Sequence, residues 1–489
     1  MGLREKTLSA VRWNLLSTML STSLGIMSLW ILSHWLTTQD YGVISAALII
    51  STFFTMLLDF GISNSIVRSK NITIIELSSL YVINILLGIV ICSLVFIFSN
   101  NIANLFKANE MLISQIKIMS FGFVILAFSL QPRALLTREM NFSAIAKISI
   151  ITVLTNFIIV ISLAWFYRSP WCIAVGFLIS SIVNAVASKY ATRSQIKYNF
   201  SFQFSSIKKH FRYGLQLVLD SIVNQISINT YPVLMSRLIN LTAIGGYNIA
   251  YSISIALFEK LNPVLSHTLF PVFSKISDDE SKLQSSFLRV TTYAAMINFP
   301  MLLGMMLIAK PLISLFFDEK WWFIIPIVKI LCVVGAIRSL DTSVISILLV
   351  KAQMYRNVLM GLAKIILGIP LTWILGRDFG ILGIVYGFLI IQILNTFFGY
   401  FFLIKPSIHI RGVDYIKSIC VPFFHVIPMI SVGMILLSFL PEKNNIISLA
   451  TIIITCFLTF VVTIILSPID SIKEFKSIIS DGFFKKVLR

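Results

Sequence analysis

Runs of roughly 20 apolar residues, separated by short polar stretches, recur along this whole chain. A helix needs about 20 mainly apolar residues to cross a bilayer, because each residue advances it by only about 1.5 Å. Charged residues make up 12% of the 489 residues, whereas a soluble domain carries about 25%. The pattern excludes a soluble fold and predicts an all-α, polytopic membrane protein.

The length rule finds about fourteen segments that could span a membrane. They are Val11–Trp35, Val43–Ile66, Leu77–Phe98, Met111–Leu136, Ile145–Phe166, Trp171–Ala187, Tyr213–Met235, Ala243–His267, Phe287–Ile308, Phe323–Val350, Val358–Leu375, Ile381–Ile404, Ile416–Leu440 and Ile446–Leu466. The first is too long for a signal peptide and no small-residue cleavage site closes it, so we interpret it as a retained helix.

Loops rich in lysine and arginine alternate with loops that contain few, and this alternation predicts the orientation of the chain in the membrane. Cytoplasmic loops of membrane proteins collect these residues. The longest polar loop, Lys189–Arg212, is strongly basic, as is the tail after Leu466. We therefore expect this loop and both termini to be cytoplasmic. The formal net charge of +19 follows from this bias and does not indicate nucleic-acid binding.

The same loop divides the chain into two sets of six predicted helices, and a weak repeat crosses it. The turn Leu36–Gly42 resembles Leu241–Tyr247, and Arg12-Trp13-Asn14-Leu15 resembles Arg212-Tyr213-Gly214-Leu215. Internal repeats of this kind are typical of transporter lobes, which enclose the substrate path. We expect lobes at 1–195 and 196–410, with two additional helices and a tail at 411–489.

Motifs of soluble catalysis and of metal binding are absent from the sequence. It contains no Walker A, GxSxG or HExxH motif. The five cysteines form no CxxC pair, so neither a disulfide framework nor a metal site is indicated. The predicted outer loops are too short for the folded domain that a membrane glycosyltransferase would need. We therefore expect no enzyme activity, cofactor or catalytic residue.

Polar residues inside the predicted spans are the candidates for a functional site, because an ionisable group there costs about 2.5–3.5 kcal/mol on insertion scales. Such groups should face protein or water. Two stripes on the segment Tyr213–Met235 suggest a water-filled path, since their members recur at helical spacing. The candidate cavity-lining residues are Arg133, Asp220, Asn224, Gln225, Asn229, Lys260, Arg338, Asp341 and Lys364.

Other interpretations of these residues stay open. Arg133 and Lys260 could extend their charged ends to the interface. Arg338 and Asp341 are three positions apart on one predicted helix, so they could form a purely structural ion pair.

Four short motifs resemble a known family. They are Leu36–Gly42, Asp59-Phe60-Gly61-Ile62-Ser63, Arg133-Ala134-Leu135-Leu136 with Arg138, and Gly246–Tyr251. Their order and spacing are similar to those of bacterial polysaccharide flippases of the O-antigen and colanic acid type. These belong to the multidrug/oligosaccharidyl-lipid/polysaccharide exporter superfamily. The resemblance covers essentially the whole chain.

The resemblance implies two six-helix lobes around a central cavity, followed by two additional helices. The implied substrate is an oligosaccharide on undecaprenyl pyrophosphate, moved to the outer leaflet by alternating access for surface polysaccharide synthesis. It also implies membrane lipid and polysaccharide polymerase machinery as partners. A cationic interior suits the anionic diphosphate, because guanidinium groups bind phosphate oxygens in pairs.

The alternative is an ion-coupled multidrug exporter of the same superfamily, or a subunit that transports nothing. Drug exporters of this type often carry an acidic residue in the first helix as an ion site. The segment Val11–Trp35 contains no Asp or Glu, which argues against the drug branch. The polar stripes argue against a subunit without transport.

Overall fold

The computed structural model describes residues 3–69, 72–107, 110–193, 204–256, 259, 273, 276–351, 353–439, 446–469 and 472–476. Throughout these ranges every regular element is a helix, which confirms the predicted all-α class. The chain forms two compact units, Met1–Asn248 and Ile249–Arg489.

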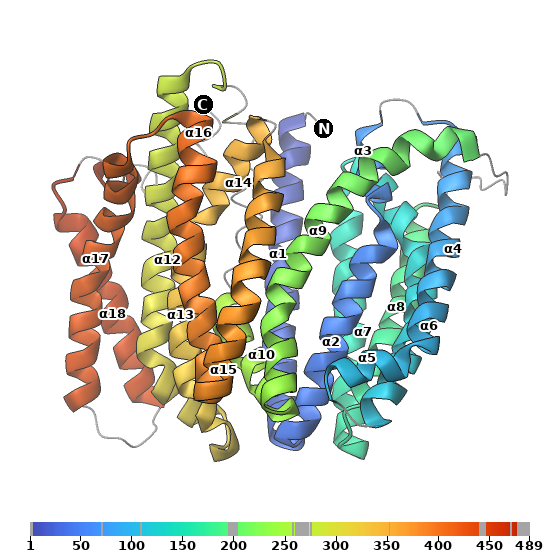
Figure 1. Cartoon of the computed structure of the whole chain (residues 1–489), viewed down its shortest axis with the longest axis horizontal. Coiled ribbons are helices and arrows are strands. Elements are labelled where there is room, and N and C mark those ends of the chain that lie inside the picture. Colours follow the sequence, from blue (N-terminus) through green and yellow to red (C-terminus); the bar gives the residue numbers. More distant parts are fainter. Residues whose placement is uncertain are drawn as a thin grey trace. The chain divides into compact units, whose positions relative to one another are not determined.

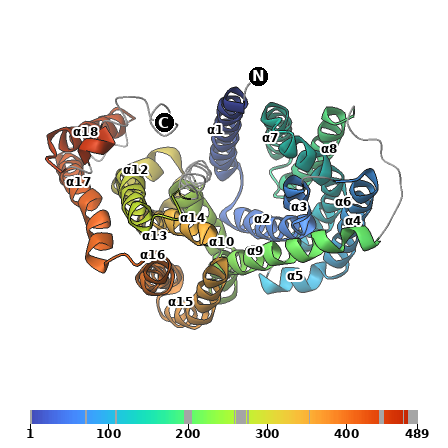
Figure 2. The same ribbon diagram turned by 90° about the horizontal axis from the view of Figure 1, so that it is seen from above.

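The first unit consists of helices α1–α9 and most of α10. Their bounds are α1 Leu3–Trp35, α2 Thr38–Asp59, α3 Ile62–Arg68, α4 Ile74–Ile97, α5 Ser99–Leu105, α6 Glu110–Arg138, α7 Phe142–Tyr167, α8 Cys172–Ala191, α9 Phe204–Leu238 and α10 Leu241–Tyr251. Helix α6 lies at the centre, in contact with α2, α4 and α8 (Figure 2).

Small residues allow these helices to approach closely. A Cβ atom on Gly88 of α4 would come within 2.9 Å of Ala127 on α6. A Cβ on Gly122 of α6 would come within 2.4 Å of Phe177 on α8. Close backbone approach is how membrane helices associate, because lipid tails are as apolar as the side chains and give no hydrophobic driving force.

The predicted segment Val43–Ile66 is interrupted in the structure. Phe60 and Gly61 both have left-handed backbone angles, with φ of 42° and 69°, so α2 ends at Asp59 and α3 begins at Ile62. The carboxylate of Asp59 accepts hydrogen bonds from both the main-chain N–H and the hydroxyl of Ser63. The motif Asp59–Ser63 therefore builds a fixed break between two helices.

The second unit begins near the end of α10 and continues to the tail. Its further elements are the π turn η1 Ser252–Ala256, α12 Glu280–Phe316, the 3₁₀ turn η2 Glu319–Ile324, α13 Ile325–Arg338, α14 Asp341–Val350, α15 Met354–Gly399, the π turn η3 Tyr400–Ile404, α16 Lys405–Ile408, α17 Gly412–Phe439 and α18 Ile446–Leu466. Helices α17 and α18 pair with each other and with α12 (Figure 1).

Helix α15 is a hairpin of two arms rather than one long rod. Gly380 has a non-helical backbone, with φ of 62° and ψ of −141°. The arms before and after Gly380 contact each other. A Cβ on Gly387 would come within 2.5 Å of Thr372, and a Cβ on Gly383 would come within 1.9 Å of the Leu375 oxygen. The two predicted spans Val358–Leu375 and Ile381–Ile404 are these arms.

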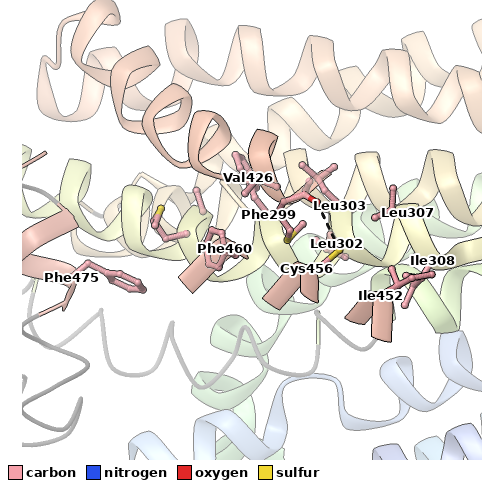
Figure 3. Close-up of a cluster of buried hydrophobic side chains, with 14 of the residues drawn as sticks. Phe299, Leu302, Leu303, Leu307, Ile308, Val426, Ile452, Cys456, Phe460 and Phe475 are labelled. Atoms are coloured by element: carbon pink, nitrogen blue, oxygen red, sulfur yellow. Dashed lines mark hydrogen bonds between the residues drawn. The ribbon is translucent and has the colours of Figure 1, made fainter. Parts of the chain in front are cut away.

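An apolar cluster joins α12 to α17 and α18 in the second unit. Figure 3 shows its labelled members Phe299, Leu302, Leu303, Leu307, Ile308, Val426, Ile452, Cys456, Phe460 and Phe475. The thiol of Cys456 donates to the main-chain oxygen of Met429 at 3.7 Å. A Cβ on Gly433 would come within 2.1 Å of Leu307, so α17 and α12 also meet at a small residue.

Eleven helical segments in the described part of the chain are long and apolar enough to cross a membrane. One of them, Met354–Ile408, contains both arms of the α15 hairpin. Two more predicted spans, Tyr213–Met235 and Ala243–His267, coincide with α9 and with a region that is only partly described. The result confirms a multi-pass membrane protein. The predicted number of about fourteen spans remains approximate.

The two compact units differ from the expected lobe boundaries at residues 195 and 410. Helix α9 packs on α2, α3 and α4, and therefore belongs with the first unit (Figure 1). A division into two six-helix lobes around a central cavity stays a prediction.

Candidate functional site

A kink inside a membrane-spanning segment defines the candidate site of the second unit. The segment Phe323–Val350, which the sequence predicted as one span, lies within the candidate span Glu319–Val350. Helix α13 ends at Arg338 and α14 begins at Asp341, and the turn between them, at Ser339 and Leu340, keeps right-handed helical backbone angles.

Arg338 forms an ion pair with Glu259. Its Nη2 lies 3.0 Å from Oε1 of Glu259, and the two side chains are 22% and 32% exposed. Tyr251 of α10 bridges the pair, because its hydroxyl donates to Oε2 of Glu259 at 2.9 Å and accepts from Nη1 of Arg338 at 3.4 Å. The three side chains form a closed ring of charge-assisted contacts, which are stronger than neutral hydrogen bonds.

Asp341 lies in a second polar group, centred on the α15 hairpin. Its Oδ2 accepts from Nε2 of Gln392 at 3.2 Å and from Nδ2 of Asn395 at 3.4 Å. Both amides belong to the second arm of α15, while Lys364 belongs to the first arm and interacts electrostatically with Asp341. The start of α14 and both arms of the hairpin thus contribute to one polar cluster.

These contacts correct the predicted pairing of Arg338 with Asp341. In the structure Arg338 forms its ion pair with Glu259, and Asp341 accepts hydrogen bonds from the two amides. The charges of Arg338 and Asp341 still interact. Helical spacing brings Arg338 and Asp341 near each other, but Nη2 of Arg338 lies 3.0 Å from Oε1 of Glu259. Of the predicted residues, the structure brings together Arg338, Asp341 and Lys364.

Sequence reasoning missed four members of the cluster, namely Tyr251, Glu259, Gln392 and Asn395. Gln392 and Asn395 are three positions apart in an otherwise apolar helix, and this spacing was a usable signal. The irregular turn η1, directly before Glu259, was not visible in the sequence. Such π turns are often found at functional sites.

Arg133 lies in the first unit, on α6. It is half-buried, and its Nη2 donates to the hydroxyl of Ser149 on α7 at 2.9 Å. Its neighbour Gln131 is fully buried and donates to the main-chain oxygen of Leu77 on α4. Among the described residues, the hydrogen-bond partner of Arg133 is therefore one neutral hydroxyl, on the neighbouring helix α7.

The predicted stripes on α9 are only partly described. Asn224 is exposed, while Gln225 and Asn229 are half-buried, and Nδ2 of Asn229 donates to the main-chain oxygen of Gln225 at 2.9 Å. The side chain of Asp220 and the whole of Lys260 lie outside the described residues. That these residues line a cavity stays a prediction.

Two buried amides in the first unit have no hydrogen-bond partner among the described residues. Asn84 and Gln115 are both 0% exposed, and neither their amide nitrogens nor their oxygens are bonded. Buried polar groups usually pair with protein or water. Over the described ranges, no group of three or more His, Cys, Asp or Glu side chains could hold a metal ion.

Comparison with known proteins places the sequence in a family. Residues 31–326 match the family described as polysaccharide biosynthesis protein. The chain is 35% identical to the lipopolysaccharide biosynthesis protein WzxC of Escherichia coli (strain K12) over 433 residues, which are 88% of each chain. It is 32% identical to a membrane protein in the cps region of Klebsiella pneumoniae, over 100% of this chain and 99% of that one.

The chain belongs to the polysaccharide biosynthesis protein family. This confirms the resemblance drawn from the four motifs. In fold, this family member is similar to the lipid II flippase MurJ in an inward closed conformation, with a TM-score of 0.75, 16% identity, and coverage of 97% of this chain and 99% of that chain. It is also similar to an inward-facing multidrug transporter of the MATE family, with a TM-score of 0.64 at 14% identity over 80% and 94% of the two chains.

Proposed function

We propose that this family member is a flippase for oligosaccharides linked to undecaprenyl pyrophosphate. It moves them from the inner to the outer leaflet of the bacterial inner membrane by alternating access, for O-antigen or exopolysaccharide synthesis. Relatives are named for teichuronic acid biosynthesis in Bacillus subtilis and for succinoglycan biosynthesis transport in Rhizobium meliloti. The activity is transport rather than catalysis.

The observation that carries this proposal is that the cations Arg338 and Lys364 lie in one polar cluster inside two candidate membrane spans, at the kink between α13 and α14 and on the first arm of α15. Ionisable residues inside membrane spans commonly mark a substrate path. The planar guanidinium of Arg338 suits a diphosphate, because it can donate two parallel hydrogen bonds to phosphate oxygens. Lys364 would add a less directional charge.

The remaining features of the proposal rest on the sequence. Arg133, Asp220, Asn224, Gln225, Asn229 and Lys260 would line the path, with the termini and the Lys189–Arg212 loop in the cytoplasm. Polysaccharide polymerase machinery would take the product at the outer face.

Multidrug export is the second candidate, since the fold is similar to that of drug transporters. The span Arg12–Trp35 contains no Asp or Glu, which is the sequence feature against it.

Reconstituted vesicles can test the two candidates directly. Vesicles would contain either a fluorescent lipid-linked oligosaccharide or a cationic dye such as ethidium. We expect the protein to move the lipid, detected by an impermeant lectin, and not the dye. Arg338→Gln should slow lipid movement at least about tenfold, because a hydrogen bond to a charged group contributes about 1.5–3 kcal/mol.

The matched control is Lys282→Gln, which removes an exposed cation paired with Asp279 in the first turn of α12. It should move lipid at the wild-type rate. Dye transport without lipid transport would overturn the proposal in favour of drug export.

A further inference from the structure

Two cations, Lys107 and Arg237, lie at the end of the first unit that the charge pattern predicts to be outside the cytoplasm. Nζ of Lys107 donates to the main-chain oxygen of Arg237 at 2.7 Å, and Nε of Arg237 donates to the main-chain oxygen of Leu105 at 2.8 Å. These contacts join the end of α5 to the end of α9, which lie next to each other in Figure 2. Cations are favoured there, because the last carbonyls of a helix carry partial negative charge.

The two positive charges have no counter-charge from the described part of the chain. Neither Lys107 nor Arg237 forms an ion pair within those ranges, and Glu110, the acidic residue that follows along the chain, forms none either. Arg237 is half-buried, but its terminal nitrogens Nη1 and Nη2 are not closed off from solvent. Two like charges are thus held side by side with hydrogen-bond donors to spare.

The spare donors suit a phosphate group. The bond from Nε fixes the plane of the Arg237 guanidinium, whose two terminal nitrogens form the fork that binds two oxygens of one phosphate. The ammonium group of Lys107 has further N–H donors beside this fork. Because backbone contacts already order both side chains, an anion would bind them with a smaller loss of conformational entropy.

Exposed apolar residues beside the cations favour a lipid over a soluble anion. The side chains of Phe98 and Leu105 are each 50% exposed, and that of Ile97 is 69% exposed. One candidate span ends at Ile97 and the next begins at Glu110, so the connection between them lies at a membrane surface. A phospholipid offers both a phosphate and apolar chains at this depth, whereas free phosphate offers only charge.

We propose that Lys107 and Arg237 form a binding site for an anionic phospholipid of the outer leaflet. The Arg237 fork binds two oxygens of the lipid phosphate, Lys107 contacts the same phosphate, and the acyl chains lie against the exposed apolar side chains beside them. The lipid offsets both charges and adds a further link between α5 and α9. This inference does not depend on the proposed function, because Arg338 and Lys364 belong to the second unit.

The test is native mass spectrometry of the full-length protein in detergent, titrated with phosphatidylglycerol and, as the zwitterionic reference, with phosphatidylcholine. Arg237→Gln should weaken binding of the tightest phosphatidylglycerol at least about tenfold, as the loss of a charge-assisted hydrogen bond predicts. Phosphatidylcholine should bind both proteins alike.

A second variant separates lipid binding from the packing of α5 on α9. In Lys107→Glu the new carboxylate should pair with Arg237, so that the two helices stay joined while the fork is occupied. We expect this variant to melt close to the wild type and still to bind phosphatidylglycerol at least about tenfold more weakly. Should Arg237→Gln fold poorly, Lys107→Glu decides the question alone.

Arg168 provides the matched control. It is exposed, follows the end of α7, and has the same φ of 46° as Lys107. Arg168→Gln should bind phosphatidylglycerol and melt like the wild type. An equal loss of binding in Arg168→Gln would indicate general attraction to a basic surface and would overturn the site, as would wild-type binding by both Arg237→Gln and Lys107→Glu.

Competition identifies the source of the phosphate. Inorganic phosphate in excess should not displace the lipid; if it does, the ligand is a soluble anion. A site that takes a polyprenyl diphosphosugar but not phosphatidylglycerol would belong to the transport substrate. Either result overturns the proposal that a phospholipid of the bilayer occupies this site.

Discussion

The main-chain oxygen of Leu241 lies 2.0 Å from the position that a Cβ atom on Gly42 would take. Gly245 also approaches the first turn closely, since a Cβ atom on it would come within 2.9 Å of the Gly42 nitrogen. The two glycines belong to the turns Leu36–Gly42 and Leu241–Tyr247, which resemble each other in sequence. The repeated turns therefore pack on one another, backbone against backbone, within the first unit.

Gly42→Ala should destabilise the protein, because the new methyl group meets a backbone oxygen that cannot rotate away. Overpacking of this kind costs about 1–3 kcal/mol. We expect a lower melting temperature in detergent. Gly25→Ala is the control, since a Cβ there meets no atom within 4 Å, and alanine favours a helix over glycine by about 0.5–1 kcal/mol. Equal melting of the two variants would show that the turns are not tightly packed.

A second prediction concerns the segment at residues 472–476, which packs onto α12. Ile472 and Phe475 are 0% and 5% exposed, and the Phe475 ring lies 5.4 Å from that of Tyr293. Phe475→Ala should loosen the segment, because truncating a buried phenylalanine costs about 3–5 kcal/mol. Limited proteolysis would then cleave the tail faster. Lys473→Ala is the comparison on the same segment, and faster cleavage in both would contradict a specific role for the ring.

Much of the architecture follows from composition, because only helices satisfy their own backbone groups in lipid. The span Ile446–Leu466 has the same bounds in the sequence prediction and in the structure. Breaks were harder to predict. Gly61 and Gly380 adopt positive φ and interrupt helices, whereas the kink after Arg338 lies at Ser339 and Leu340, which keep helical backbone angles and carry no such signal.

The candidate site was predictable in its cations but not in its contacts. Arg338 and Lys364 are conspicuous because ionisable residues are rare in apolar helices. Their neighbours depend on which helices meet, and Glu259 is 79 positions before Arg338 along the chain. Helical spacing relates residues on one helix only, so it favoured Asp341 as the partner and could not indicate Glu259.

The orientation of the chain can be tested by cysteine labelling. In a variant without native cysteines, an impermeant reagent added to intact cells should label a cysteine at Asp378 and miss one at Lys197. The expectation rests on the basic loop Lys189–Arg212, because such loops stay in the cytoplasm. Labelling of the Lys197 site in intact cells, with permeabilised cells as the reference, would reverse the predicted topology.

The polar stripe on α9 gives another test. Replacing Asp220 and Asn224 together by leucine should leave the protein inserted, since leucine is favoured in lipid by about 0.3–0.6 kcal/mol per residue. Transport should fall, because a water-filled path would lose its polar lining. The control replaces Ile222 and Ile226 by leucine on the same helix. Full transport by the Asp220 and Asn224 double variant would mean that the stripe serves helix packing.

Variants of Arg133 can distinguish substrate recognition from a structural role, because among the described residues its side chain donates to a single neutral hydroxyl, that of Ser149 at 2.9 Å. If Arg133 contacts the substrate's diphosphate, Arg133→Gln should be expressed and melt like the wild type. It should nevertheless slow transport by at least about tenfold, as the loss of a charge-assisted hydrogen bond predicts. Arg133→Lys should restore only part of the rate, because an ammonium group lacks the planar fork of a guanidinium.

The competing interpretation is that Arg133 fastens α6 to α7 through Ser149 and does nothing else. On that view Ser149→Ala removes the same contact, so Ser149→Ala and Arg133→Gln should lower the melting temperature and the transport rate to the same extent. Under recognition, Ser149→Ala leaves the guanidinium in place and transport stays close to wild type. Normal transport by a well-expressed Arg133→Gln protein would exclude this residue as a required phosphate contact and leave Arg338 and Lys364 as the cations of the site.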